Sequence, residues 1–243
     1  MDSKIETINL LLEYKSDLNS KDKNEITPLH FASSYNSNVD ILKFLIEKNA
    51  DLYCKNMKGL TPLHLACAKN SNFQVIKILI EKKAILNDKD KDGSTPFHLA
   101  CGSNKNMQII KYLIEKKSEI NLKDSEESTP FHFACSNNTN LEIIKYLIEK
   151  RANINGLNKN FYSPLHFACI NNSNLDVIKI LIENKSEPFM NEKGARDPIT
   201  YILLNQNLKE VFKFLFNLFN FLIKKEFGIK KPKKFRFEKW RFC

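Results

Sequence analysis

The sequence predicts an all-α solenoid, a stack of similar helix-turn-helix units, because two phrases recur along the chain at one spacing. The first phrase reads Thr-Pro-Leu-His-Phe-Ala or a close variant, and each copy begins 34 residues after the last. Its five copies begin at Thr27, Thr61, Thr95, Thr129 and Ser163. The second phrase reads Ile-Lys-Tyr-Leu-Ile-Glu or similar and keeps the same spacing. Self-similarity at a period of about 20 to 50 residues is typical of repeat proteins.

The first phrase is typical of the start of a short helix. Thr61 is a good N-cap, and Pro62 suits the first helical position, where no backbone N–H is needed. Leu63, Ala66 and Cys67 then have the spacing of a buried stripe. The other copies of the phrase predict the same helix.

The second phrase predicts another helix that packs against the first. The turn Asn70-Ser71-Asn72 separates them; we expect Asn70 to end the first helix in the left-handed conformation and Asn72 to cap the next. Residues 73–82 carry apolar side chains at helical spacing, namely Phe73, Ile76, Leu79 and Ile80. A polar turn, residues 87–93, joins the unit to the next. Because neither helix buries its apolar face alone, neighbouring units must stack.

These phrases resemble the ankyrin repeat, whose hallmark is Thr-Pro-Leu-His at the start of the first helix. The resemblance covers about residues 5–216 and implies an all-α solenoid of helix pairs linked by β-turns or hairpin loops. Tetratricopeptide repeats have a similar period of about 34 residues, but their Trp, Gly and Tyr pattern is absent. The usual ankyrin repeat has about 33 residues. The extra residue here lies between the helices, where Asn-Ser-Asn replaces a shorter turn that contains glycine.

The ends of the chain depart from the regular repeat. Residues 1–21 are an N-terminal half-repeat with the second helix only, and residues 22–191 hold five ankyrin repeats. Residues 192–228 are a degenerate C-terminal capping repeat, and residues 229–243 are a basic aromatic tail. The long helix expected between residues 208 and 225 has one narrow polar stripe, so something must cover its apolar surface. Three candidates fit as the cover of this apolar surface: the tail itself, a protein partner such as a second copy in an oligomer, and a membrane surface.

The formal net charge is +10, and most of it lies at the C-terminal end. Residues 224–243 hold nine Lys or Arg against two Glu, which gives +7 and leaves +3 for the rest. The tail, with interleaved Phe, Trp and Arg, is therefore an alternative binding element for nucleic acid or an anionic membrane surface. No signal-peptide pattern opens the chain, and no apolar run reaches the roughly 18 residues that span a bilayer. We expect a cytoplasmic protein, and a nuclear location also fits.

Histidine and cysteine occupy repeated positions. The resemblance implies that each motif histidine braces the preceding Thr and the neighbouring turn; these are His30, His64, His98, His132 and His166. The cysteines after the motif Ala act as small buried apolar residues and lie too far apart to pair; they are Cys67, Cys101, Cys135 and Cys169. No CxxC spacing, phosphate-binding glycine loop, nucleophile elbow or carboxylate pair is present. We predict no metal, no cofactor and no enzymatic activity.

Glycine is missing from some of the hairpin turns. Gly59 and Gly93 stand where the resemblance places the hairpin glycine, but Glu25, Glu127 and Phe161 replace it elsewhere. A non-glycine residue with positive φ costs about 1 kcal/mol. We therefore expect these three turns to be reshaped.

In ankyrin proteins the hairpin tips and the exposed side of the first helix line a concave groove that binds a partner. The resemblance thus implies a protein–protein interaction module or adaptor. The candidate partner-binding residues are Ile26, Met57, Lys58, Leu60, Lys91, Asp92, Glu126, Lys159, Phe161 and Tyr162. Among them, Met57 with Leu60 and Phe161 with Tyr162 carry apolar or aromatic groups, which are favoured interface anchors.

Overall fold

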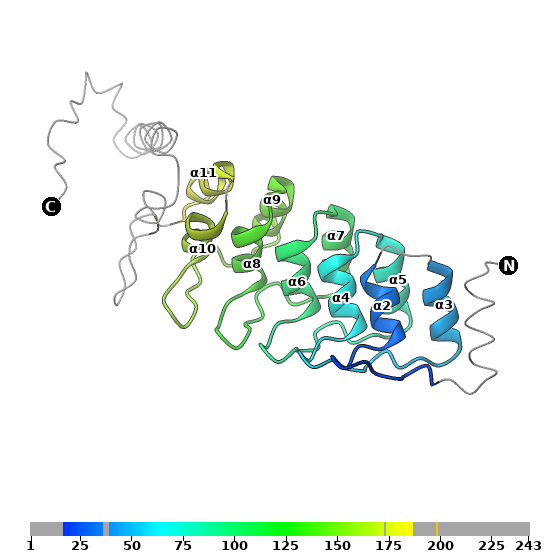
Figure 1. Ribbon diagram of the computed structural model, residues 1–243. Coiled ribbons are helices and arrows are strands. Elements are labelled where there is room, and N and C mark those ends of the chain that lie inside the picture. Colours follow the sequence, from blue (N-terminus) through cyan, green and yellow to red (C-terminus); the bar gives the residue numbers. More distant parts are fainter. Residues whose placement is uncertain (1–16, 36–38, 173, 187–197, 199–243) are drawn as a thin grey trace, which may run out of the picture.

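The computed structural model describes residues 17–35, 39–172, 174–186 and 198. In this part of the chain all the regular elements are helices, and they alternate between two kinds. The first helices of the units are α2 (Pro28–Ser34), α4 (Pro62–Lys69), α6 (Pro96–Ser103), α8 (Pro130–Asn137) and α10 (Pro164–Asn171). The second helices are α3 (Val39–Glu47), α5 (Phe73–Glu81), α7 (Met107–Glu115), α9 (Leu141–Glu149) and α11 (Leu175–Glu183). The predicted all-α stack of helix pairs is confirmed (Figure 1).

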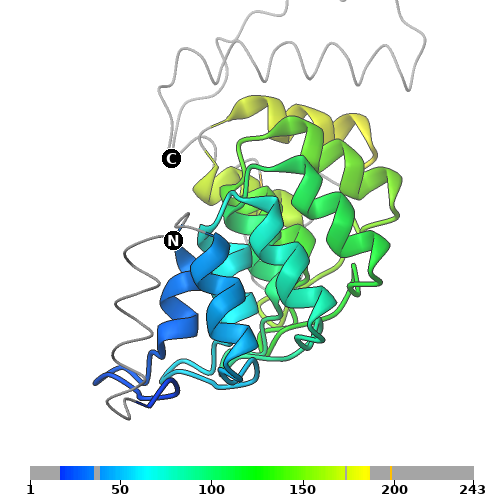
Figure 2. The ribbon, with the colours of Figure 1, turned by 90° about the vertical axis from the view of Figure 1, so that its right-hand side faces the viewer.

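The two kinds of helix form two layers. First helices pack against one another along the stack from α2 to α10, and second helices do the same from α3 to α11. Figures 1 and 2 show that the loops between successive units all project on one side of the helices. The apolar core therefore runs through the described stack as one cluster, to which every helix contributes.

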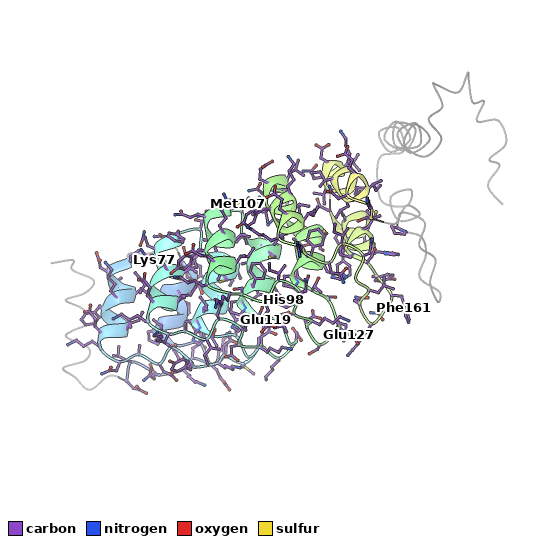
Figure 3. The ribbon with its side chains drawn as sticks, turned by 180° about the vertical axis from the view of Figure 1, so that it is seen from behind. Lys77, His98, Met107, Glu119, Glu127 and Phe161 are labelled. Carbon is purple, nitrogen blue, oxygen red and sulfur yellow. The ribbon has the colours of Figure 1, made fainter. Side chains whose placement is uncertain are left out.

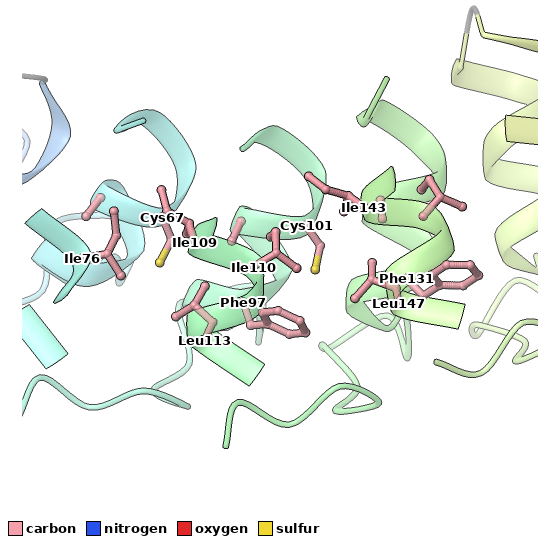
Figure 4. Close-up of a cluster of buried hydrophobic side chains, with 14 of the residues drawn as sticks. Cys67, Ile76, Phe97, Cys101, Ile109, Ile110, Leu113, Phe131, Ile143 and Leu147 are labelled. Carbon is pink, nitrogen blue, oxygen red and sulfur yellow. The ribbon is translucent and has the colours of Figure 1, made fainter. Parts of the chain in front are cut away.

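One junction between repeats shows how this core is built. Phe97 of α6, Ile110 of α7 and Phe131 of α8 are fully buried, and Figure 4 shows them in one cluster with Cys101. Burying an aliphatic or aromatic side chain of this size contributes about 1.5 to 3 kcal/mol. The cysteines of the described part are all free and buried. This outcome is expected for Cys67, Cys101, Cys135 and Cys169, which lie one repeat apart.

Each first helix begins as the motif predicts. The Thr61 hydroxyl accepts a hydrogen bond from the backbone N–H of His64 (3.4 Å), and His64 Nδ1 accepts the backbone N–H of Thr61 (3.1 Å). Pro62 lies in the first turn of α4, where no hydrogen bond within the helix requires a backbone N–H. The reciprocal contact pairs two N–H groups that a helix start otherwise leaves open. The same capping box occurs at the start of the other first helices.

The turn between the two helices corrects one prediction. Asn70 has φ −97° and ψ 122°, so it is extended and not left-handed. Its buried amide links two repeats, because Nδ2 donates to the carbonyls of Ser33 (3.0 Å) and Tyr35 (3.1 Å) while Oδ1 accepts the N–H of Asn72 (2.9 Å). Asn104, Asn138 and Asn172 link repeats in the same way, with the carbonyl of the asparagine one repeat earlier in place of the Tyr35 carbonyl as second acceptor. We call this set the asparagine ladder; Asn72 also caps α5, as predicted.

The hairpin turns without glycine keep the shape of those with it. Glu25, Glu127 and Phe161 have φ of 58°, 59° and 60°, against 76° at Gly59 and Gly93. Their backbone hydrogen bonds match those of the glycine turns, so the prediction that they are reshaped is wrong. The physical reason is a clamp at the start of every turn, where an Asp or Asn side chain accepts two backbone N–H groups of the loop.

The second helices also end in left-handed residues, none of them glycine. These residues are Asn49, Lys83, Lys117, Arg151 and Lys185. After α5, the N–H of Lys83 donates to the Ile80 carbonyl (3.0 Å) and the N–H of Ala84 donates to the Leu79 carbonyl (3.0 Å). This Schellman closure satisfies the last carbonyls of the helix.

Several predictions fall on residues outside the described ranges. They are most of the N-terminal half-repeat, the capping repeat with its apolar helix between residues 208 and 225, and the tail at residues 229–243. The domain boundaries therefore stay predictions. None of the helices in the described part is long and apolar enough to cross a membrane.

Candidate functional site

The tips of the hairpin loops form a continuous row. We call residues 23–24, 57–58, 91–92, 125–126 and 159–160 the tip row. One backbone N–H in each tip after the first donates to a carbonyl of the preceding tip. The pairs are Met57 with Asn24 (3.1 Å), Lys91 with Lys58 (3.0 Å), Ser125 with Asp92 (2.9 Å) and Lys159 with Glu126 (2.9 Å). The predicted partner-binding residues on the tips are thereby brought into one register.

Buried histidines tie the first helices to this row. His64 Nδ1 accepts the N–H of Thr61, so Nε2 carries the proton and donates to the Ser94 carbonyl of the next hairpin (3.1 Å). His98 and His132 make the same kind of bridge. Burial lowers the pKa of each of these three histidines from 6.5 to about 4. The rings are neutral and fully engaged in supporting the hairpins, which is the role that the resemblance implies.

A set of lysines also spans the hairpins, and the predicted site does not include it. The ammonium groups of Lys21, Lys55 and Lys89 each donate to the carbonyl of the residue 34 positions later, over 3.2, 2.9 and 3.2 Å. Lys55 also pairs with Asp88 at 2.8 Å. Their spacing of one repeat is a signal in the sequence. These cations join repeats, whereas the lysines of the tip row are exposed and make no such bond with any described residue.

The candidate residues differ in solvent exposure. Met57 is 53% exposed, and the charged candidates are exposed as well; these are Lys58, Lys91, Asp92, Glu126 and Lys159. Ile26, Leu60, Phe161 and Tyr162 are half-buried. The Tyr162 ring lies 5.3 Å from the His166 ring, so the second apolar tip is partly used inside the fold. Figure 3 shows Phe161 and Glu127 at the ends of neighbouring loops, away from Lys77 and Met107 on the second helices.

The predicted set omits a row of side chains on the first helices, directly after the motif histidine. We call it the helix-one row; it consists of Phe31, Leu65, Leu99, Phe133 and Phe167. The Phe133 ring packs edge-on against His98 of the preceding repeat at 5.3 Å, and Phe167 packs against His132 at 5.2 Å. Phe31 lies on the earliest described first helix and is 50% exposed. Its ring stacks at 6.3 Å on Tyr35, which is 58% exposed.

The remaining reactive groups are held in unreactive forms. Burial raises the pKa of the Cys67 and Cys169 thiols, which keeps them protonated. Within the described ranges no three His, Cys, Asp or Glu side chains converge to form a metal site. The accessible groups of the candidate site are exposed charged and apolar side chains, such as Lys91 and Asp92 on the tip row and Phe31 on a first helix.

Comparison with known families gives one extensive match. A model described as "Ankyrin repeats (3 copies)" matches residues 1–90, 37–124, 68–158, 99–193 and 132–226 in overlapping windows. A comparison with curated proteins finds no match. Ankyrin repeats are generally protein–protein interaction modules. With the motif, the helix pairs and the hairpin row in place, the chain belongs to the ankyrin repeat family.

Proposed function

We propose that this chain is a protein-binding module or adaptor that holds a macromolecular partner along the tip row and the helix-one row. One observation carries the proposal: backbone hydrogen bonds set the tips in a single register, while their exposed side chains differ from tip to tip. Positions inside the stack repeat almost unchanged, as at the buried His64, His98 and His132. A fixed frame that presents variable side chains is suited to recognition and not to one conserved chemical step.

The exposed tip residues have no role inside the fold that would otherwise account for them. Lys91 and Asp92 lie at one tip, and their side chains make no hydrogen bond or ion pair with any described residue. Lys89, two residues earlier, is engaged with the Lys123 carbonyl (3.2 Å). The groove that the family resemblance implies would therefore present exposed lysine and carboxylate side chains that could form ion pairs with a partner.

Site-specific photocrosslinking tests this function. The photoreactive residue p-benzoylphenylalanine would replace Lys91 or Glu126 on the tip row, and Lys111 or Lys179 on exposed positions of the second helices as matched controls. In nuclease-treated cell extract we expect protein crosslinks from the tip positions and not from the controls. Crosslinks that form equally from both faces, or from the second helices alone, would rule out the tip row as the binding surface.

The basic aromatic tail supports an alternative function, binding of nucleic acid or of an anionic membrane surface. Its support is the sequence alone, since nine Lys or Arg lie within residues 224–243 and these are outside the described residues. Counterion release makes such binding fall steeply with salt. Replacing Lys230, Lys231, Lys233 and Lys234 with Gln should then abolish binding to oligonucleotides or anionic vesicles, measured across a salt series. Unchanged binding would reject the tail as the site.

A further inference from the structure

We propose that the first two repeats bind an acidic segment of a partner protein that carries a bulky apolar side chain. The proposal rests on the protein-binding function above and names the chemistry of the partner. The surface consists of Phe31, Tyr35 and Met57, flanked by the tip lysines Lys23 and Lys58 and by Lys69 at the end of α4. We call these six residues the N-terminal patch.

Two of the three apolar residues of this patch, Tyr35 and Met57, are not required by the repeat. Tyr35 is 58% exposed, and the equivalent positions of the later repeats hold Lys69, Ser103, Asn137 and Asn171. Met57 is 53% exposed, and its equivalents are Lys23, Lys91, Ser125 and Lys159. Solvent-facing positions that accept Ser and Lys elsewhere in the same stack carry large apolar groups here, which favours an interface.

Hydrogen bonds between the repeats bring the elements of the patch together. His30, directly before Phe31, has its Nε2 at 2.9 Å from the Leu60 carbonyl, so the start of α2 lies against the hairpin of Met57 and Lys58. At the other end of α2, Asn70 Nδ2 donates to the Tyr35 carbonyl (3.1 Å), which places the ends of α2 and α4 side by side. The patch therefore spans α2, α4 and the adjoining hairpins.

The charge around the apolar groups is positive and uncompensated. Lys23, Lys58 and Lys69 are exposed, and within the described ranges none of them has a carboxylate at ion-pair distance. The nearby carboxylates are already engaged. Asp22 accepts the N–H groups of its own turn, and Glu25 pairs with Lys21 at 3.3 Å. A partner with carboxylates next to its apolar side chain supplies the missing charge.

The sign of the charge along the tip row favours a protein segment over a nucleic acid. Beyond the second hairpin the tips also carry carboxylates, since Asp92 lies beside Lys91 and the next tip holds Glu126 beside Ser125. A phosphate backbone that continued along the row would meet these carboxylates, whereas a short acidic peptide ends before them. The patch also offers Met57, an aliphatic thioether that packs well against apolar side chains of varied shape.

Peptide selection with matched variants tests this inference. A phage library of short random peptides would be panned against the full chain, and enriched peptides would be synthesised with a fluorescent label. The test variant combines Tyr35→Ser, Met57→Ser and Lys58→Glu, which copy the residues found two repeats later. The control variant is Lys179→Ser, which removes an exposed lysine of α11 outside the proposed binding surface. A separate variant, Lys159→Ser, reports on the tip row far from the patch. Urea midpoints and circular dichroism would verify that all three variants stay folded.

We expect the enriched peptides to share Asp or Glu next to Phe, Leu, Met or Trp. The triple variant should weaken their binding by at least about tenfold, while Lys179→Ser leaves it unchanged. Peptides without carboxylates, or peptides that bind the triple variant as tightly as the parent, would overturn the inference. A labelled oligothymidylate that binds the parent and is lost with the triple variant would instead assign the patch to nucleic acid.

The same data separate this inference from the proposed function. If Lys159→Ser weakens the selected peptides and the triple variant does not, binding through the tip row stands while the N-terminal patch is rejected. If no peptide is enriched but protein crosslinks form from Lys91, the partner chemistry is wrong and the module function stands. If neither peptides nor crosslinks are found, both proposals fail.

Discussion

The first two repeats and the three that follow share one core but present different surfaces. The exposed large hydrophobic side chains of the described part all lie between residues 31 and 85; they are Phe31, Tyr35, Tyr53, Met57 and Ile85. Equivalent positions in the later repeats hold mostly Ser, Asn and charged residues. The capping boxes, the buried histidines and the asparagine ladder are the same in both regions. The positions that hold the core and those that we propose to bind a partner are therefore separate sets, and each set can be changed alone.

The largest expected effect concerns the shared core and follows from the buried histidines. Burial lowers the pKa of His64, His98 and His132 from 6.5 to about 4, so the fold favours their neutral form. Stability is then complete above pH 6.5 and is lost as the pH falls toward 4. At about pH 5 the loss amounts to roughly 1 to 2 kcal/mol per histidine. Urea denaturation near neutral pH and near pH 5 measures it.

Two carboxyls act against this loss at lower pH. Burial raises the pKa of Asp90 and of Asp124, so their protonation favours the fold. The histidine effect is therefore best measured above the range in which carboxyls titrate. A His98→Gln variant removes one titrating group and should give a shallower dependence of stability on pH. Equal urea midpoints at the two pH values would show that the histidines do not set the acid limit.

Substitutions in the asparagine ladder test whether the ladder contributes equally to stability in the first two repeats and in the later ones. Asn70 joins the first two repeats and Asn138 joins two later ones, and both amides are buried with three hydrogen bonds. Replacing either residue with Ala leaves buried carbonyls and an N–H without partners, at a cost of roughly 2 to 3 kcal/mol. Asn121, which is exposed, is the control, and its Ala variant should cost less than about 1 kcal/mol. Chemical denaturation gives all three values, and a much smaller cost at Asn70 would break the comparison.

We expect a smaller change in stability when Ser and Cys are exchanged at the core position that follows the motif Ala. Ser33 occupies the place of Cys67 and Cys101 in the next repeats, and its buried hydroxyl has no hydrogen-bond partner among the described residues. Ser33→Cys should therefore stabilise the chain by about 1 kcal/mol. Cys101→Ser should destabilise it by a similar amount, since it creates the same unpaired hydroxyl. Thermal melts of both variants measure the exchange; shifts of the same sign would contradict it.

The sequence predicts those features whose causes lie within one repeat. The Thr-Pro-Leu-His phrase contains its own cap and its own first turn, so the helices and their starts follow from it. Asn70 was placed in the wrong conformation because its partners, the carbonyls of Ser33 and Tyr35, belong to another repeat. The turn at Glu127 keeps its shape because Asp124 clamps it, a contact that propensity alone does not report.

The candidate site was predicted less completely for the same reason. Residues on the tips follow from the family resemblance, and the structure aligns them by backbone bonds between hairpins. Phe133 and Phe167 each pack against a histidine ring of the preceding repeat, whereas Phe31 on the earliest described first helix is 50% exposed, and no motif states this difference. The lysines that cross between hairpins, such as Lys55, are separable from free tip lysines only once their acceptors are known.

The smallest expected effect separates specific recognition from general hydrophobicity. Tyr53 stands where other repeats place an asparagine, and its hydroxyl donates to the Lys83 carbonyl at the end of the second helix (3.4 Å). At the same position of a later repeat, the Asn121 side chain accepts the backbone N–H of Asn153 (2.8 Å). In Tyr53→Asn the new amide oxygen should accept the corresponding backbone N–H of Ile85. We therefore expect the free energy of unfolding to change by no more than about 0.5 kcal/mol. Because Tyr53 contacts the second-helix layer, the variant should leave peptide binding at the N-terminal patch unchanged. Loss of that binding in a titration with labelled peptide would mean that all the exposed apolar side chains contribute to binding without regard to position. The first two repeats would then differ from the later ones only in surface hydrophobicity and not in a specific binding site.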